Sequence, residues 1–210
     1  MKNLIIVGAG GYGREMYGAA CAGRLPGVDA FAVKGFLDDN PRALDGFAGY
    51  PPVLGTIQDY VPQADDVFIT AFGNLATRRR VVERLAAKGA RFATLVAASA
   101  FLGPNVTVGE GSFIAPAVSL TADVRIGRHA AVFHNTSIGH DAVLGDFTHV
   151  YAQCSLGGAV KVGDGAQVFP GAVVVPRRTI GAGATVGAGA TVVLNVEPGT
   201  TVFGSPAAVV

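Results

Sequence analysis

Residues 132–149 read VFHNTS-IGHDAV-LGDFTH, and each group of six begins with Val, Ile or Leu. The same rhythm runs from Val96 to Val192, which is (192 − 96)/6 + 1 = 17 positions, without a miss or an insertion. The fifth place of each six is nearly always small, and Arg178 is the clear exception. A period of six fits neither a helix of 3.6 residues per turn nor an alternating strand, but it is typical of the hexapeptide repeats of a parallel β-helix.

Three such hexads make one triangular coil of 18 residues, and successive coils stack at the spacing of paired strands, about 4.8 Å. The first residue of each hexad points inward, where a fully buried Val, Ile or Leu stabilises the fold by about 1.5–3 kcal/mol. We therefore predict a parallel β-helix over residues 96–197 and a tail over residues 198–210. Aromatic side chains recur once per coil and predict a stripe along one corner, formed by Phe133, Tyr151 and Phe169. Periodicity alone does not set the hand of the coil.

Residues 1–95 have a different pattern, in which short apolar runs alternate with helical stretches. Strands are predicted over Lys2–Val7, Val33–Leu37, Val67–Phe72 and Phe92–Val96, and helices over Arg14–Ala22 and Leu75–Lys88. Asn74 is a candidate N-cap of the second helix, and Gly89 is suited to end it. Strands that alternate with helices indicate a small Rossmann-like α/β domain with a parallel sheet.

A Gly-rich turn, G-x-G-x-x-G at residues 8–13, follows the first predicted strand. Ligands of such sheets bind at the carboxyl ends of the strands, where glycines let the backbone approach a phosphate and a helix N-terminus favours its charge. The candidate nucleotide-binding residues at these ends are Gly10, Gly11, Tyr12, Asp38, Asp39, Gly73 and Asn74. Asp38 or Asp39 would accept hydrogen bonds from a ribose or a base. A Gly-rich turn without a ligand and ordinary dinucleotide binding both stay open as alternatives.

The bulk composition excludes several classes of protein. A net charge of +1 gives no footprint for nucleic-acid binding. Cys21 and Cys154 lie in unrelated contexts, so a disulfide is not expected. We find no segment that resembles a signal peptide and no apolar run of the roughly 18 residues needed to cross a membrane. A soluble, cytoplasmic protein is therefore expected, with the arginines of residues 78–80 on a solvated helix face.

The order of these parts resembles one known family. A short α/β domain with a Gly-rich first turn, F-L-D-D at residues 36–39 and A-F-G-N at residues 71–74 precedes uninterrupted hexads. This arrangement is similar to the nucleotide-sugar N-acetyltransferases of the bacillosamine-pathway and GDP-perosamine type, and to related sialic acid O-acetyltransferases. They form a subgroup of the left-handed β-helix (hexapeptide-repeat) acyltransferases. The resemblance implies a left-handed coil, acetyl-CoA as cosubstrate, a nucleotide sugar held by the first domain, and a homotrimer. Tyr12 departs from the bacillosamine-pathway pattern, which has histidine there.

All four histidines lie between His129 and His149, and none takes an inward place of the repeat. Acetyl transfer to a sugar amine needs a base, because such an amine is partly protonated near pH 7. A histidine, with an ordinary pKa of about 6.5, suits that task, and an adjacent carboxylate can orient it. The resemblance implies His140 as the general base and Asp141 as its orienting partner. His129 and His134 are expected to be surface residues.

The resemblance also implies contacts with acetyl-CoA. They are His149, in the D-F-T-H segment, and the backbone at Gly158, Pro170 and Ala188. A backbone N–H near Gly158 is a candidate donor to the oxyanion that forms during acyl transfer. The residues after Phe203 resemble the family's ending that lies beside the CoA. Cys154 is expected to be a small inward residue, so no acyl-cysteine is predicted.

The predicted function is acetyl transfer from acetyl-CoA to the amine of a UDP- or GDP-linked 4-amino sugar, by direct attack and without a metal. O-acetylation of a sialic acid or another sugar hydroxyl is the nearest alternative. A zinc hydratase would need three histidines around one metal, and no histidine precedes His129 to complete such a set. A non-catalytic scaffold that binds sugar nucleotides is a further alternative. The sequence leaves the nucleotide base open among UDP, GDP and dTDP.

Overall fold

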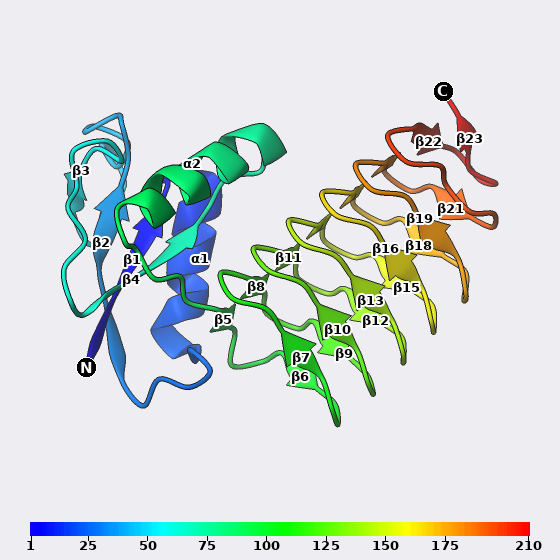
Figure 1. The fold of residues 1–210 in the computed structure, drawn as a ribbon, viewed down its shortest axis with the longest axis horizontal. Coiled ribbons are helices and arrows are strands. Elements are labelled where there is room, and N and C mark those ends of the chain that lie inside the picture. Colours follow the sequence, from blue (N-terminus) through cyan, green and yellow to red (C-terminus); the bar gives the residue numbers. More distant parts are fainter. The chain divides into compact units, whose positions relative to one another are not determined.

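The computed structural model describes residues 1–210, and the chain divides into two compact units, residues 1–98 and 99–210. The first is a small α/β domain, and the second is a parallel β-helix (Figure 1). The predicted fold class is confirmed, including the left hand of the coil. Neither helix has the length and apolar character needed to span a bilayer.

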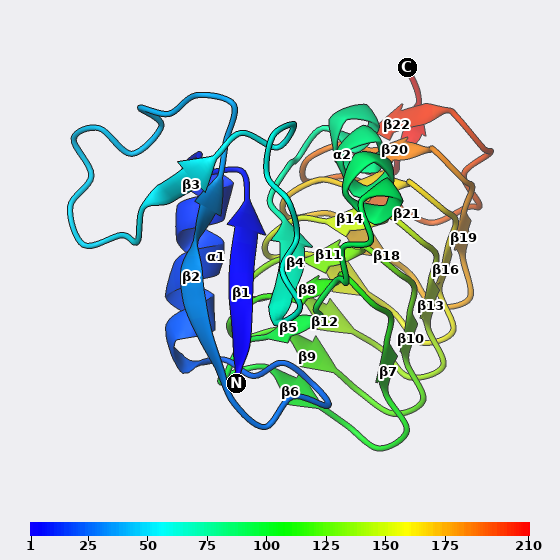
Figure 2. The same ribbon diagram turned by 60° about the vertical axis from the view of Figure 1, so that its left-hand side comes forward.

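The first unit is built on a parallel sheet with the strand order β3-β2-β1-β4 (Figure 2). The strands are β1 (Lys2–Val7), β2 (Phe31–Leu37), β3 (Val53–Gly55) and β4 (Asp66–Thr70), and the helices are α1 (Gly11–Ala22) and α2 (Leu75–Ala87). Because the strands are parallel, their carboxyl ends meet at one edge of the sheet. We call it the carboxyl edge.

The two helices cover opposite faces of this sheet. Val81 and Leu85 of α2 pack in one cluster with Leu37 of β2. Tyr17 of α1 contacts the neighbouring Phe36, at 6.1 Å between ring centroids. Successive residues of a strand point to opposite faces, so α1 and α2 bury different sides.

Two details of the first unit differ from the prediction. The expected strand Phe92–Val96 is wrong, because Phe92 makes only an isolated bridge to Phe68. Only β5 (Leu95–Val96) remains of it, and this strand is in step with the hexads. β3 was missed because it has only three residues and follows two prolines, a poor strand signal.

The second unit repeats a two-residue strand at every hexad. These strands are β6 (Phe101–Leu102), β7 (Thr107–Val108), β8 (Phe113–Ile114), β9 (Ser119–Leu120), β10 (Arg125–Ile126), β11 (Ala131–Val132), β12 (Ser137–Ile138), β13 (Val143–Leu144), β14 (His149–Val150), β15 (Ser155–Leu156), β16 (Lys161–Val162), β17 (Gln167–Val168), β18 (Val173–Val174), β19 (Thr179–Ile180), β20 (Thr185–Val186) and β21 (Thr191–Val192). Every third strand pairs in parallel, which produces the stacked coils of Figure 1.

The pairing gives the triangular β-helix three faces, and we call this body of stacked coils the prism. The β12 face has the order β6-β9-β12-β15-β18-β21, and the β13 face has the order β7-β10-β13-β16-β19. The β14 face runs β8-β11-β14-β17-β20 and continues into β22 (Thr201–Phe203), which pairs antiparallel with β23 (Ala208–Val209). The segment 198–210, predicted as a tail, therefore includes two strands of the β14 face.

The aliphatic rhythm forms the core of the coils. All of its positions are buried except Leu102 and Val108, which are half-buried. These two lie on β6 and β7, each of which ends its sheet and pairs on one side only. The inward direction of the rhythm is therefore confirmed over the length of the prism.

A second rhythm, which the sequence reasoning missed, sets the corners. The fourth residue of each hexad from Asn105 to Gly189 has a positive φ of 53–73°, at (189 − 105)/6 + 1 = 15 consecutive positions. Asn, Asp and Gly tolerate this left-handed conformation, but it strains residues such as Phe147 and Arg177. The repeated left-handed residue turns the chain at each corner and keeps the coils in register.

Candidate active site

His140 and Asp141 lie in the turn between β12 and β13, on the outside of the prism. Both side chains are exposed, at 68% and 62%. The His140 Nδ1 and an Asp141 carboxylate oxygen are 2.7 Å apart. Asp141 occupies the left-handed fourth place of its hexad, with φ of 60°. The structure thus pairs the predicted base with its predicted orienting carboxylate.

This pairing defines which histidine nitrogen is available. An ionised carboxylate only accepts hydrogen bonds, so neutral His140 donates its Nδ1–H to Asp141. The Nε2 then keeps its lone pair and can accept a proton. A neutral imidazole held in this tautomer is the arrangement that general-base catalysis requires.

Gly158, at the same place in the next coil, lies directly beside this imidazole. A Cβ at Gly158 would stand 2.6 Å from the His140 Nε2 and 2.8 Å from its Cε1. The backbone holds the two coils together, since the Ala159 N–H donates to the His140 carbonyl oxygen at 2.7 Å. The observed position of the ring therefore depends on glycine at position 158.

His149 lies inside a stack of aromatic rings. Its ring is 4.9 Å from that of Phe133 and 4.2 Å from that of Tyr151, with interplanar angles of 11° and 22°. Tyr151 also stacks on Phe169 at 4.7 Å, so the predicted aromatic stripe is confirmed. His149 is 1% exposed. His149 takes a non-inward place of its hexad, yet it is buried because neighbouring rings cover it.

His129 is also buried, at 9% exposure, although it was expected on the surface. Its ring stacks on Phe147 at 5.0 Å, one coil further on. On the other side it lies over Gly111, where a Cβ would be 2.2 Å from its Nδ1. The period of the coil thus brings a glycine, a histidine and a phenylalanine into one column. His134 is half-buried and touches Phe133 edge-on.

The remaining predicted acetyl-CoA residues divide between two corners of the β-helix. Gly158 lies at the same corner as His140, between the β12 and β13 faces. Pro170 and Ala188 follow β17 and β20 and lie between the β14 and β12 faces, where both are exposed. One chain therefore brings together His140, Asp141 and Gly158 but keeps Pro170 and Ala188 at another corner of the prism.

A shallow groove of about 530 Å³ runs along the β13 face. It begins at Val143, two residues after Asp141, and extends across β16 and β19. Glycines and aliphatic side chains form most of its lining, and Lys161 and Asp164 are its charged members. A shallow, mainly apolar groove of this kind suits a long flexible chain with few polar groups.

Asp38 shapes the Gly-rich turn at the carboxyl edge. Its carboxylate oxygens accept the Ala9 N–H at 2.8 Å and the Asn40 N–H at 2.9 Å. Gly13 is required by packing, because a Cβ there would be 1.9 Å from the Gly8 carbonyl oxygen. The Asp38 carboxylate therefore already has a structural role, because it holds the Gly-rich turn. The ligand role predicted for Asp38 would use the same carboxylate.

The other predicted nucleotide residues lie at the same edge. Gly10 caps α1, and Gly11 begins it, three residues earlier than predicted. The Asn74 Oδ1 accepts the Thr77 N–H at 2.9 Å, so the predicted N-cap of α2 is confirmed. Gly10, Gly11, Gly73 and Asn74 are exposed. The edge therefore presents two helix N-termini that can favour a negatively charged group.

The predicted solvated run of arginines is wrong for Arg78, which is 2% exposed. It shares the buried face of α2 with Val81, Val82 and Leu85. Residues three, four and seven apart lie on one side of a helix, so its phase buries Arg78. Its neighbours Arg79 and Arg80 are exposed as predicted.

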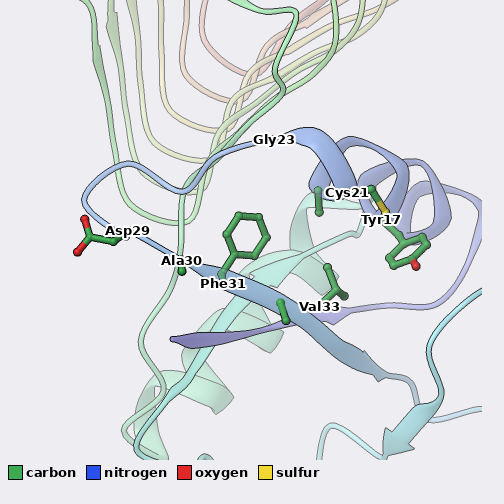
Figure 3. A pocket seen from close by; sticks show the side chains of 9 residues that line it. Tyr17, Cys21, Gly23, Asp29, Ala30, Phe31 and Val33 are labelled. Carbon is green, nitrogen blue, oxygen red and sulfur yellow. The ribbon is translucent and has the colours of Figure 1, made fainter.

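A second hollow of about 470 Å³ opens at the opposite edge of the sheet (Figure 3). Tyr17 and Cys21 of α1 and Phe31 and Val33 of β2 line it. It lies at the amino ends of the strands, whereas ligands of parallel α/β sheets bind beyond the carboxyl ends. We assign it no part in the candidate site.

Cys154 and the metal-ligating residue types also bear on the chemistry. Cys154 is buried as predicted, at 2% exposure, and burial raises the pKa of its thiol to about 11. A protonated, buried thiol is a poor nucleophile. The chain has no group of three or more His, Cys, Asp and Glu side chains placed to hold a metal ion.

A buried network fixes the amino side of the sheet. Asp66 is 1% exposed and accepts hydrogen bonds from Tyr60 at 2.8 Å and Lys34 at 3.0 Å. Burial acts to raise the pKa of the Asp66 carboxyl, but hydrogen bonds from the Gln63 N–H, Tyr60 and Lys34 outweigh it. The pKa therefore lies below its ordinary value.

Known proteins resemble this chain in both of its units. Residues 3–85 match the family model of the PglD N-terminal domain. The UDP-N-acetylbacillosamine N-acetyltransferase of Bacillus subtilis is 34% identical over 121 residues, which are 54% of this chain and 51% of that protein. The chain thus spans about half the length of this curated relative.

Solved structures extend the similarity. A mutant of perosamine N-acetyltransferase from Caulobacter crescentus, in complex with CoA and GDP-perosamine, is 26% identical with a TM-score of 0.86, covering 100% of this chain and 97% of that one. The chain resembles this nucleotide-sugar N-acetyltransferase over its whole length. WeeI from Acinetobacter baumannii AYE is 27% identical with a TM-score of 0.86, and the two chains cover each other completely. The acetyltransferase domain of PglB from Neisseria gonorrhoeae FA1090, in complex with acetyl coenzyme A, is 28% identical with a TM-score of 0.74, covering 100% and 99%. The resemblance inferred from the sequence is confirmed.

Proposed function

We propose that this protein transfers the acetyl group of acetyl-CoA to the amine of a nucleotide-linked amino sugar. The observation that supports it most is the exposed pair of His140 and Asp141, whose 2.7 Å contact leaves Nε2 beside Gly158. The similar perosamine N-acetyltransferase was crystallised with CoA and GDP-perosamine, which are the two classes of substrate proposed here.

In this proposal His140 is the general base. As the amine nitrogen bonds to the acetyl carbon, it loses a proton, and the His140 Nε2 accepts that proton. Asp141 holds the ring and stabilises the imidazolium that forms. When the carbon–sulfur bond breaks, His140 returns the proton to the departing thiol. Acetyl-CoA supplies the acetyl group, and neither a metal nor an acyl-enzyme takes part.

Gly158 has a second role in this scheme. Its N–H has no backbone acceptor within the chain. We assign this N–H to the oxygen of the thioester carbonyl, which becomes negative during the transfer. A preorganised donor of this kind typically contributes on the order of 10²–10³ in turnover.

The acetyl-CoA site is proposed to form between chains. His140 and Gly158 lie at one corner of the prism, and Pro170 and Ala188 at another. A homotrimer would bring one chain's first corner to its neighbour's second corner, with three equivalent sites. The groove of the β13 face fits the flexible part of CoA in size and lining. His149 stays a proposed acetyl-CoA contact, which requires its covering rings to shift.

The nucleotide sugar is proposed to bind the carboxyl edge of the first unit. Gly10 and Gly11 would place the N-terminus of α1 against its phosphates. Tyr12, Asp38, Asp39, Gly73 and Asn74 complete the proposed contacts.

The test is an acetylation assay with a defined set of acceptors. Purified protein receives acetyl-CoA with UDP-, GDP- or dTDP-linked 4-amino sugars, or with free sialic acid, and thiol release is followed together with the mass of the product. We expect one nucleotide-linked amine to gain a single acetyl group that hydroxylamine does not remove, as befits an amide. A hydroxylamine-labile product would favour the O-acetyltransferase alternative. Absence of thiol release with every acceptor would refute the proposal.

A further inference from the structure

The lateral edge of β2 is only partly covered within the first unit. β3 pairs with β2 at Phe36 and Leu37 alone, so the amino half of β2 has no strand on that side. The cover begins at Gly35, where a Cβ would be 2.5 Å from the Pro52 carbonyl oxygen. Residues 31–33, which precede it, therefore have a free side, and we call them the open edge.

The open edge directs backbone groups away from the sheet. The hydrogen-bonding groups of successive residues in a strand point to opposite neighbours. The Lys2 N–H donates to the Ala30 carbonyl oxygen at 2.9 Å, so Ala30 and Ala32 face β1. Phe31 and Val33 then point their N–H and C=O groups outward, where no hydrogen bond within the chain uses them. Such unpaired groups are a template for another extended backbone.

The hollow of about 470 Å³ at the amino ends of the strands lies beside the open edge (Figure 3). All of residues 29–33 line it, so the hollow follows the edge, and Tyr17 and Cys21 of α1 form its other wall. Every second side chain of an added strand would point toward α1 and into this hollow. The rings of Tyr17 and Phe31 favour an apolar side chain there.

Asp29 places a negative charge at the amino end of the open edge. It is exposed, and it is the only charged side chain that lines the hollow. None of the four ion pairs of the chain uses its carboxylate. A carboxylate without a partner attracts a Lys or Arg side chain of a bound segment. The charge and the apolar rings together define what the occupant must carry.

We propose that the open edge binds an extended peptide segment of a partner protein by β-strand addition. The outward backbone groups of Phe31 and Val33 pair with the backbone of the segment. An apolar side chain of the segment enters the hollow, and a Lys or Arg near one end meets Asp29. In this mode main-chain hydrogen bonds provide affinity, and the pocket provides specificity. The inference is independent of acetyl transfer, because none of these residues belongs to the proposed catalytic or substrate contacts.

The experiment begins with a phage library of random nonapeptides, selected on the full chain. We expect the enriched peptides to share an apolar residue and a Lys or Arg, separated by an even number of positions, as one face of a strand requires. The consensus peptide is then synthesised with N-methyl groups on every second residue, in each of the two possible registers. Fluorescence anisotropy should show that one register loses binding and the other retains it, because only alternate N–H groups would face β2.

Three variants of the full chain locate the bound peptide. Val33→Pro removes an outward N–H, and a strand edge tolerates proline where the sheet does not use that N–H. Asp29→Lys reverses the charge, and Glu15→Lys is its matched control, since Glu15 is exposed on α1 but does not line the hollow. We expect the consensus peptide to bind on the order of 10-fold more weakly to Val33→Pro and about 5-fold more weakly to Asp29→Lys. Its affinity for Glu15→Lys and the acetylation turnover of all three variants should be unchanged.

Three results would overturn the inference without touching the proposed acetyl transfer. If the library yielded no specific peptide, the edge would not bind an extended segment. If the consensus peptide bound Val33→Pro and Asp29→Lys as tightly as the unchanged protein, it would bind elsewhere. If Val33→Pro had a smaller mass in sedimentation, the edge would pair with a second copy of this chain instead. Should Val33→Pro fail to fold, Asp29→Lys and the two N-methylated peptides decide the question.

Discussion

The contact between His140 and Gly158 makes a sharp prediction for the substitution Gly158→Ala. A Cβ at this position would be 2.6 Å from the His140 Nε2. Ordinary contacts between such atoms are about 3.5 Å, so the ring must move by about 1 Å. Because His140 is 68% exposed, the ring can swing outward without disturbing the core. We therefore expect a displaced base on an intact prism.

A displacement of about 1 Å in a catalytic group can lower turnover on the order of 10²-fold. We expect a loss of that size in kcat for Gly158→Ala. The free energy of unfolding should hardly change, because Gly158 is not among the glycines with positive φ. The prediction therefore separates activity from stability.

The assay compares steady-state kinetics and thermal unfolding of Gly158→Ala with those of Gly18→Ala. A Cβ at Gly18 would meet no atom within 4 Å, which makes it a suitable control for the same chemical change. Gly18→Ala should retain full turnover. Unchanged turnover in Gly158→Ala would refute the view that glycine sets the position of the base. A large loss of stability would mean that the substitution acts through the fold instead.

Three further predictions follow from the structure. Asp141→Asn should lower kcat on the order of 10²-fold without a change in the melting temperature, because asparagine tolerates the left-handed conformation but no longer stabilises an imidazolium; kinetics and thermal unfolding of the variant check this. Asp66→Asn should destabilise the first unit by about 2 kcal/mol. This cost is smaller than that of breaking a fully buried ion pair, because Lys34, the partner of Asp66, is one-third exposed. Since the pKa of Asp66 is lowered by folding, its stabilisation is present above the unfolded value of 3.8 and disappears as the pH falls below it. Urea unfolding measured from pH 7 to 3 should therefore show that the free energy of unfolding depends less on pH in the variant than in the unchanged protein. The same pH dependence in both proteins would contradict this. Gly183→Ala should cost about 1 kcal/mol through backbone strain alone, since its φ is 67° and a Cβ there would meet open space; unfolding with urea measures it, and no loss would contradict it.

The fold could be predicted because one physical signal repeats without interruption. Val, Ile or Leu at every sixth position leaves little choice about which side of the chain faces the core. The same pattern put His140 outside, and the structure agrees. The left hand came from family resemblance, because burial periodicity is the same in a coil of either hand.

The errors arise where neighbouring coils decide the environment. The repeat says whether a side chain points inward, but not what covers an outward one. His129 and His149 are covered by rings from adjacent coils, Phe147 and Phe133. With one coil of 18 residues to a row, the sequence aligns Gly111, His129 and Phe147 in one column and His140 with Gly158 in another.

The first unit was harder to predict for a different reason. Its short strands carry little periodicity, so Val53–Gly55 was missed and Phe92–Val96 was overestimated. Burial of Arg78 follows from the phase of α2, which composition alone does not reveal. The hollow that Arg80 and Arg84 line was not predicted either, because it forms only where α2 lies beside the residues that follow β2.

The most direct test is the turnover of His140→Ala with acetyl-CoA and the accepted sugar nucleotide, with circular dichroism to verify the coil. If the exposed imidazole is the base, turnover should fall by roughly 10²–10⁴ while the spectrum and the binding of both substrates are preserved. A variant that folds, binds both substrates and acetylates at the original rate would contradict the account.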